Sequence, residues 1–358
     1  MKYSLSLGKI SGIKVEIHWT FLILIIWVIF SGLKTQSSPD QIMWSVFFVL
    51  AIFLCVILHE LGHALAAKKF NIKTTSITLL PIGGLAQMES IPEKPKEELI
   101  IAFAGPAVNV VIAAILYPIT GLFAEDFKEL SITVQSDNFL IALMSVNVWL
   151  ALFNLIPAFP MDGGRVFRAL LSFKLGHVAA TRIAASVGQM LGIGFVLFGF
   201  FYNPFLIFIG FFIYIGAGSE SVYTLTKSML QGYTIKDVLM HDVPFIDKNA
   251  QVKEAVNQLL NSQNKHFVVT DAGKPVGTLN RDQIIKALHE QSDKILVDQI
   301  KNDALMYFPA ETPLDKVWRE LQKQKIILVA DNGELEGIVD DENLTEFILI
   351  HSAEKPGR

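Results

Sequence analysis

Two histidines four residues apart are the residues in this sequence that could most directly carry out chemistry. They lie in the segment His59-Glu60-Leu61-Gly62-His63, with a carboxylate beside the first imidazole. On an α-helix, residues i and i+4 lie one turn apart on the same face, so both rings can reach one zinc ion. Glu60 could then accept a proton from water at that ion. The pattern predicts zinc-dependent hydrolysis, and the alternative is two histidines packed in a helix bundle without metal.

A third ligand is expected elsewhere in the chain, because a catalytic zinc ion usually has three protein ligands and one open position. The best candidate is Asp162, which follows two prolines and precedes two glycines within residues 157–164. Prolines and glycines interrupt helices, so this carboxylate should lie on irregular backbone that can present it to a metal. The alternative is an aspartate that caps a helix at the membrane surface. Weaker candidates for the third ligand are His18, Glu89 and Glu220.

The elements that must position these side chains are long and apolar. Mean hydropathy is +0.45, and charged residues make up 18% of the chain, against about 25% in soluble proteins. A helix needs about 20 apolar residues to cross a bilayer. Since the last charge-free window is long enough for two helices with a turn at Asn203-Pro204, the sequence predicts six spans. The windows are Ile17–Leu33, Gln41–Leu58, Leu99–Ala124, Asn138–Met161 and Ile183–Ser219.

Basic residues are unevenly distributed among the predicted loops. Because positively charged loops stay in the cytosol, both termini of this multi-pass cell-membrane protein are predicted to be cytosolic. At 1.5 Å per residue, His59 lies about 27 Å and Asp162 about 36 Å along their spans, so both fall toward the cytosolic end. The basic residues that set this orientation are Lys2, Lys9, Lys14, Lys68, Lys69, Lys73, Lys94, Lys96, Arg165, Arg168, Lys174 and Arg182.

Two segments on the predicted cytosolic side are expected to be extended rather than helical. Tyr3–His18 alternates loosely around two glycines, and Thr74–Met88 is interrupted at Pro81–Gly84, which predicts a hairpin. Non-helical backbone near a membrane must be sheltered by protein or water. The predicted fold class is therefore an α-helical polytopic membrane domain with small β elements.

The last third of the chain differs from the rest in charge and in repetition. Residues 227–358 hold 16 of the 30 basic and 21 of the 34 acidic residues, as a soluble domain would. Residues 234–290 and 295–352 form an internal repeat with a constant offset of 60, in which Gly273 pairs with Gly333 and Gly277 with Gly337. Each copy is expected to fold as helix, strand, turn, strand and helix. No basic tract indicates nucleic-acid binding.

The motifs taken together resemble a known family. The His59–His63 segment in an apolar span, followed by Asn154–Gly164, closely resembles the site-2 proteases, which are intramembrane zinc metalloproteases. The resemblance covers roughly residues 1–226. It implies one zinc ion per chain, bound by His59, His63 and Asp162, with Glu60 as the catalytic base.

Other residues gain expected roles from the same resemblance. Asn154 matches an asparagine upstream of the aspartate, which implies a catalytic role in steadying the substrate carbonyl or oxyanion, and a structural hydrogen bond is the alternative. Phe103–Asn109 matches a glycine-proline-asparagine element, in which Asn109 is expected to pack between helices or to bond backbone. Gly62 is expected to permit close helix contact. The lone cysteine, Cys55, excludes a disulfide framework and is expected to pack as a small hydrophobe.

The C-terminal repeat resembles a pair of CBS domains. Such pairs often bind adenine nucleotides through an aspartate at the start of the last helix, preceded by serine or threonine. Here Gln283 and Asn343 replace that aspartate, and Asn280 and Asp340 replace the hydroxyl residue. Nucleotide binding is therefore left open, and the alternative role is dimerisation.

These inferences combine into one predicted architecture. Residues 1–226 form a six-span metalloprotease domain, followed by an α+β module of CBS repeats at 230–290 and 291–354. The predicted function is zinc-dependent endopeptidase cleavage of membrane-spanning protein substrates within the bilayer, with a CBS pair that modulates activity or forms a homodimer. The alternative is a CBS-regulated membrane transporter or channel, in which the histidines would bind the transported ion.

Overall fold

The computed structural model divides the chain into two compact units, Met1–Thr224 and Leu225–Arg358. It describes residues 4–81, 83–89, 92, 94–120, 135–136, 138–262, 264–290, 295–331 and 334–354. The predicted end of the third span at Ala124, the N-terminal Lys2 and the repeated Gly333 lie outside these residues. The sequence places the boundary between domains at 226, two residues after the division in the structure.

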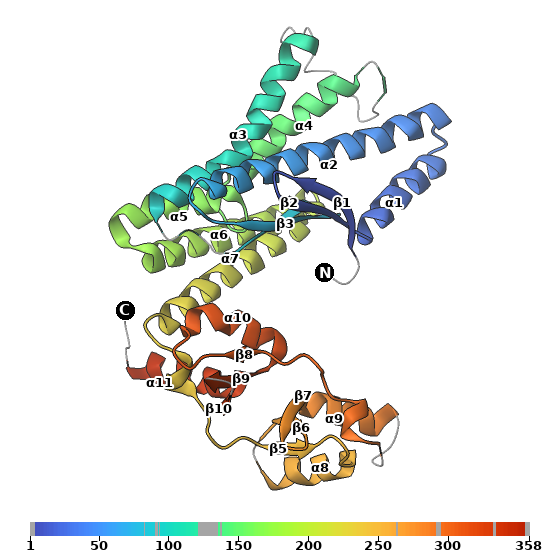
Figure 1. The fold of residues 1–358 in the computed structure, drawn as a ribbon. Coiled ribbons are helices and arrows are strands. Elements are labelled where there is room, and N and C mark those ends of the chain that lie inside the picture. The colour runs from blue at the N-terminus through green and yellow to red at the C-terminus, as the bar shows by residue number, and fades with distance from the viewer. Residues whose placement is uncertain are drawn as a thin grey trace. The chain divides into compact units, whose positions relative to one another are not determined.

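The first unit is a helical bundle with a small sheet packed against α2 (Figure 1). Helix α3 packs against α2, α4 and α5, so it contacts both of the elements that carry predicted metal ligands. The predicted turn at Asn203-Pro204 separates the last two helices. The helices are α1 (Thr20–Lys34), α2 (Pro39–Lys68), α3 (Pro95–Thr120), α4 (Phe139–Asn154), α5 (Asp162–Leu175), α6 (His177–Phe201) and α7 (Phe205–Leu230), whose last residues belong to the second unit.

The predicted count of six spans is only partly supported. Among the described residues, four helices are long and apolar enough to cross a bilayer: α2, α3, α6 and α7. Helices α1 and α4 are apolar but have 15 and 16 residues, fewer than the roughly 20 that a perpendicular crossing requires. The predicted fourth span stops at Asn154 rather than Met161, because Pro157 and Pro160 follow and cannot continue a helix.

Large apolar side chains cover the outside of the bundle. Ile26, Trp149 and Phe201 are 64%, 70% and 82% exposed, and each lies on a different helix. An apolar surface of this extent is unfavourable in water and suits contact with lipid. The outer faces of the helices thus agree with the hydropathy of the sequence.

The two segments predicted to be extended form one four-stranded sheet, which confirms that expectation. Its order is β1-β2-β3-β4, with β2 and β3 parallel and the outer pairs antiparallel. Ile77 and Leu79 of β3 are buried in a cluster that includes Ile57 and Leu61 of α2. The sheet is therefore fixed to the helix that carries the histidines, and β4 forms one of its edges. The strands are β1 (Ser4–Ile10), β2 (Ile13–His18), β3 (Thr74–Leu80) and β4 (Gly83–Met88).

The second unit contains two copies of one motif, as the internal repeat predicts. Strand orders are β5-β6-β7 in the first copy and β10-β9-β8 in the second, with a parallel and an antiparallel pairing in each. The first copy contains η2 (Ile235–Val238), β5 (Phe245–Asp247), α8 (Val252–Asn261), β6 (His266–Asp271), β7 (Lys274–Asn280) and α9 (Arg281–Glu290). The second contains η3 (Val297–Gln299), β8 (Tyr307–Phe308), α10 (Leu314–Gln324), β9 (Ile326–Asp331), β10 (Glu334–Asp340) and α11 (Asp341–Glu354).

The paired glycines of the repeat have a common structural reason. A Cβ atom on Gly277 would lie 2.8 Å from the backbone oxygen of Asn302, and one on Gly337 would lie 2.3 Å from that of Met240. In both copies a crossing segment therefore approaches the same strand position too closely for any side chain. This steric requirement accounts for two of the glycines that mark the repeat.

Candidate metal centre

Helix α2 brings the two histidines into the interior of the first unit. The helix begins with a capping box, in which the Ser38 hydroxyl accepts from the Gln41 amide and the Gln41 side chain accepts from the Ser38 amide. Its 30 residues then run uninterrupted through His59 and His63. The two rings are 7% and 4% exposed, so they lie on the buried face as the spacing predicts.

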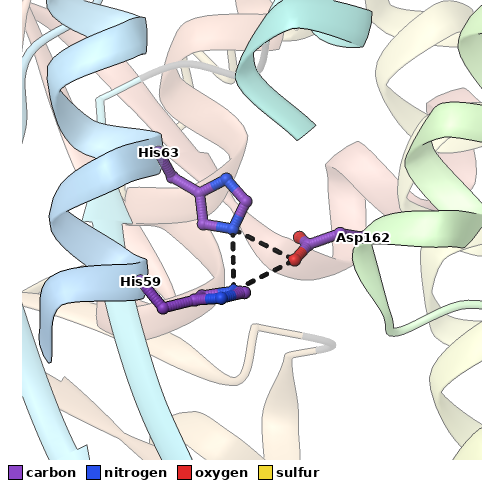
Figure 2. Close-up of side chains that lie close together, drawn as sticks. All are labelled: His59, His63 and Asp162. Carbon is purple, nitrogen blue, oxygen red and sulfur yellow. Dashed lines mark hydrogen bonds and ion pairs between the residues drawn. The ribbon is translucent and has the colours of Figure 1, made fainter. Parts of the chain in front are cut away.

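Three possible ligand atoms from α2 and α5 converge in this interior. Nε2 of His59 and Nε2 of His63 each lie 3.1 Å from Oδ2 of Asp162, and the two nitrogens are 3.1 Å apart (Figure 2). Tetrahedral ligands of one zinc ion, at about 2.0–2.2 Å from it, lie roughly 3.3–3.6 Å from one another. The observed triangle is slightly tighter than that, so a small outward shift would fit it to the ion.

The outer nitrogen of His63 is held so that the inner one can bind a metal. Nδ1 of His63 lies 2.7 Å from the backbone oxygen of Ile101 in α3. A carbonyl oxygen only accepts, so Nδ1 donates and, in the neutral ring, Nε2 keeps its lone pair for a metal. Nδ1 of His59 in turn lies 2.5 Å from Oδ1 of Asn109, also in α3. The donor set therefore suits zinc in chemistry as well as in spacing.

Two glycines give α3 its close approach to the histidines. A Cβ atom on Gly105 would lie 2.2 Å from Nε2 of His63 and 2.6 Å from Nε2 of His59. A Cβ atom on Gly62 of α2 would lie 2.7 Å from the backbone oxygen of Ala104, which confirms the predicted close helix contact. Any larger residue at Gly105 would fill the space that the ligand atoms surround. The glycine-proline-asparagine element thus forms one wall of the site.

Asp162 reaches the site from an irregular segment, as predicted, but it is itself the first residue of α5. Residues 155–161 are not helical, and Gly163 and Gly164 follow inside the helix. A Cβ atom on Gly163 would lie 2.2 Å from the backbone oxygen of Ile156, so the tight turn requires glycine. The Asp162 carboxylate thereby lies 3.1 Å from Nε2 of both histidines, where it can serve as the third ligand of a metal ion.

A buried ion cluster, which the sequence did not reveal, fixes α5 to its neighbours. Arg168 of α5 is fully buried and donates from Nε to Glu98 of α3 at 2.7 Å and from Nη1 to Glu220 of α7 at 2.6 Å. Its guanidinium also lies 5.0 Å from the centre of the Phe159 ring, three residues before Asp162. The cluster therefore stabilises both sides of the turn that presents Asp162.

The three weaker candidates for the third ligand lie outside the described metal cluster, and one expectation for Asn109 is corrected. Glu220 is bound to Arg168, and His18 bonds to the Thr20 hydroxyl at 2.8 Å, so neither joins the metal cluster. Glu89 is exposed after β4 and also lies outside that cluster. Asn109 is buried between α2, α3 and α4, as one of its two expectations had it, but its amide bonds the side chains of His59 and Asn147 rather than backbone.

The two predicted catalytic residues lie close to the ligands along the chain. Glu60 follows His59 in α2 and is partly exposed, and a Cβ atom on Gly84 of β4 would lie 2.6 Å from its Cγ. Asn154 is the last residue of α4, partly exposed, and begins the segment that leads to Asp162. Cys55 is buried, as predicted, and also accepts a hydrogen bond from Asn147.

Comparison with known proteins agrees with this arrangement. The model of peptidase family M50 matches residues 47–133 and 122–199, and the CBS domain model matches residues 235–290 and 297–350. A zinc metalloprotease of Methanocaldococcus jannaschii is 33% identical over 98% of this chain and 97% of its own length. Stage IV sporulation protein FB of Bacillus subtilis is 29% identical over 38% of this chain and 44% of its own.

A solved structure, the site-2 protease from Methanocaldococcus jannaschii, is 40% identical and covers 61% of this chain and 95% of its own, with a TM-score of 0.46. The matched family and the apolar helices indicate a membrane protein. The relative that matches almost the whole chain is a zinc metalloprotease, and the histidine and aspartate cluster supplies a donor set that suits this metal. The chain therefore belongs to peptidase family M50, as a zinc metalloprotease of the site-2 protease type that carries tandem CBS domains.

Proposed function

We propose that this chain cleaves membrane-embedded protein substrates at a zinc ion bound by His59, His63 and Asp162, with Glu60 as the general base. The observation that carries the proposal is the convergence of three ligand atoms, 3.1 Å apart, at a buried position within an apolar bundle. Ionisable groups inside a membrane protein are costly, and they are usually kept for function.

The side chains have complementary tasks in hydrolysis. Zinc, when bound, supplies Lewis acidity that makes water nucleophilic at neutral pH and polarises a carbonyl oxygen. The Glu60 carboxylate has no hydrogen-bond partner among the described residues, so it is available to take a proton from water and return it to the leaving amine. The Asn154 amide then stabilises the negative charge that develops on the substrate carbonyl.

Strand β4 supplies a place to hold an unwound substrate. A helical substrate has its carbonyl groups in backbone hydrogen bonds, so it must unwind before cleavage. Strand β4 is an edge of the described sheet, and its Gly84 lies against the side chain of Glu60. An extended substrate that adds to this edge would receive backbone hydrogen bonds beside the general base.

A photo-crosslinking experiment tests the strand. A photoreactive residue at Leu85 of β4 should crosslink substrate, whereas one at Leu7 of β1, on the opposite edge, should not. Both leucines are exposed in the structure, so access alone does not separate them. Equal crosslinking at the two edges would contradict the role of β4.

Substitution of the proposed base tests cleavage itself. Purified Glu60→Gln should retain zinc and lose at least about 100-fold in cleavage of single-span substrates in liposomes, as expected for loss of a general base. Glu97→Gln, which removes a carboxylate from an ion pair with Lys94 on the same unit, is the matched control and should cleave normally. Ion flux without product fragments would instead support a transporter.

The arrangement in the cell and the role of the CBS pair also belong to this proposal. Basic loops favour cytosolic termini, which would place the CBS pair in the cytosol. There it would modulate cleavage or join two chains in a homodimer. A C-terminal tag that external protease removes in right-side-out vesicles but not in inverted ones would contradict this topology.

A further inference from the structure

Two fully buried asparagines that are not metal ligands lead away from the metal centre. Asn109 of α3 and Asn147 of α4 are both 0% exposed. Burying an amide without partners is unfavourable, so both side chains must be satisfied by hydrogen bonds. Their partners form one chain: Asn147 donates to Leu143 and Cys55, Asn109 donates to Asn147, and His59 bonds Asn109.

The partners of Asn147, the amide farther from the metal centre, fix the direction of the hydrogen bonds in this network. Nδ2 of Asn147 lies 2.9 Å from the backbone oxygen of Leu143, one helical turn earlier in α4, and 3.4 Å from Sγ of Cys55 in α2. Because a carbonyl oxygen only accepts, the amino group of Asn147 must face it. Oδ1 of Asn147 is then left to face Asn109.

The same reasoning fixes the orientation of the Asn109 amide and the position of the proton on the His59 ring. Oδ1 of Asn147 lies 2.9 Å from Nδ2 of Asn109, which therefore donates to it. Oδ1 of Asn109 in turn faces Nδ1 of His59 and accepts, so Nδ1 must carry the proton. In the neutral ring, the lone pair of His59 is thereby placed on Nε2, toward His63 and Asp162.

The direction matters because the opposite tautomer cannot bind metal in this geometry. A proton on Nε2 of His59 would point at the other two ligand atoms, each 3.1 Å away. If Asn147 lost its oxygen, the Asn109 amide could rotate and present its amino group to Nδ1. His59 would then be driven toward that opposite tautomer.

We propose that Asn147, acting through Asn109, is a positioning residue that sets the tautomer of His59 and so strengthens zinc binding. The inference rests on the ligand set of the proposed function. It gives α4 a role in metal binding, although α4 contributes no ligand to the described cluster. The network also ties α2, α3 and α4 together at the depth of the site.

Two substitutions of nearly equal size separate this role from packing. Asn147→Asp, which is neutral when protonated at this fully buried position, keeps an oxygen that accepts from Asn109 and a hydroxyl that donates to Leu143, whereas Asn147→Leu removes both. Residues that support a ligand typically change metal affinity 10- to 100-fold. We expect about 10-fold weaker zinc binding for Asn147→Leu, measured by chelator competition on the full-length protein, and near wild-type binding for Asn147→Asp.

A double substitution tests whether the effect passes through Asn109. In Asn109→Asp, a carboxylate accepts from His59 whichever way its neighbour turns, so adding Asn147→Leu should weaken binding no further. Absorption of the cobalt-substituted protein should show the same ligand field in both Asn109→Asp variants. Should Asn147→Leu not fold, Asn147→Ala replaces it in each comparison.

The possible results are distinguishable from failure of the proposed function. If the wild type binds no zinc, the ligand set itself is wrong. If the wild type binds zinc and Asn147→Leu binds equally well, or if the losses of Asn147→Leu and Asn109→Asp simply add, the positioning role of Asn147 is wrong while the ligand set stands.

Discussion

In the protease unit, the side chains of Asn109 and Asn147 hydrogen-bond to side chains on other helices, and this network leads to His59. In the CBS unit, the polar side chains at the positions expected to contact a nucleotide bond to backbone instead. In the first CBS repeat, Oδ1 of Asn280 accepts from the Gln283 amide and Oε1 of Gln283 accepts from the Asn280 amide, both at 2.9 Å. Nε2 of Gln283 also donates to the backbone oxygen of Ile300 at 3.0 Å.

The second CBS repeat shows the same arrangement. Oδ1 of Asp340 accepts from the Asn343 amide at 2.8 Å, and Nδ2 of Asn343 donates to the backbone oxygen of Val238 at 2.6 Å. These are the positions where a CBS pair resembling this one would contact ribose, and here their side chains stabilise helix starts and loops instead. Polar side chains thus support the candidate metal site in the protease unit, whereas in the CBS unit those at the positions expected to contact ribose support local folding.

The largest effect should come from removing the charge at the metal centre. Asp162→Asn replaces the only anionic member of the described cluster with a neutral amide, which is a weaker zinc ligand. We expect metal affinity and cleavage to fall by more than the 10- to roughly 100-fold typical of residues that support a ligand. Metal analysis after dialysis measures this, with Asp282→Asn in the CBS unit as the control. Wild-type zinc content in Asp162→Asn would remove the aspartate from the site.

The next effect should come from the buried ion cluster of the protease unit. Arg168→Met would leave Glu98, 2% exposed, without its cation. Removing one partner of a buried ion pair typically costs about 3–5 kcal/mol, because the remaining charge is buried and unpaired. Unfolding in mixed detergent micelles measures the loss, with the exposed Arg182→Met as the control.

A second substitution makes that measurement decisive. Adding Glu98→Gln to Arg168→Met removes the unpaired charge and should recover part of the lost stability. If Arg168→Met alone unfolds like the wild type, the cluster does not fix α5 in the way that the structure indicates.

How much the sequence could predict depends on whether a feature is local. The spacing of His59 and His63 matches one helical turn, so the sequence predicts that both rings share one face. The strands and the apolar windows were likewise predicted, because they follow from local patterns. The partners of Asn109 and Arg168 could not be, because they depend on which helices pack together. Bonded residues lie 38 positions apart for Asn109 and Asn147, and 70 for Arg168 and Glu98. The one available signal was the presence of lone charges beside apolar spans, which usually have a partner.

A smaller effect is expected from the amides of the CBS unit. Asn343→Ala would leave the buried backbone oxygen of Val238 without its side-chain donor. An unsatisfied buried acceptor typically costs about 1–3 kcal/mol, so the CBS unit should unfold at lower temperature while zinc content stays unchanged. Asn249→Ala, at an exposed position, should alter neither. A parallel fall in zinc content would contradict the contrast between the two units.

The smallest effect should come from adenine nucleotides. A ligand that binds only the folded state stabilises it by about 2.7 kcal/mol at 100 times its dissociation constant, so binding is visible as a shift in melting temperature. Because Gln283 and Asn343 are held by backbone groups and neither is an aspartate, AMP and ATP should leave the melting of the CBS unit unchanged. A saturable upward shift would show that these amides exchange their backbone partners for ribose. In that case the CBS unit would resemble the protease unit, because the side chains of Gln283 and Asn343 would also serve a ligand.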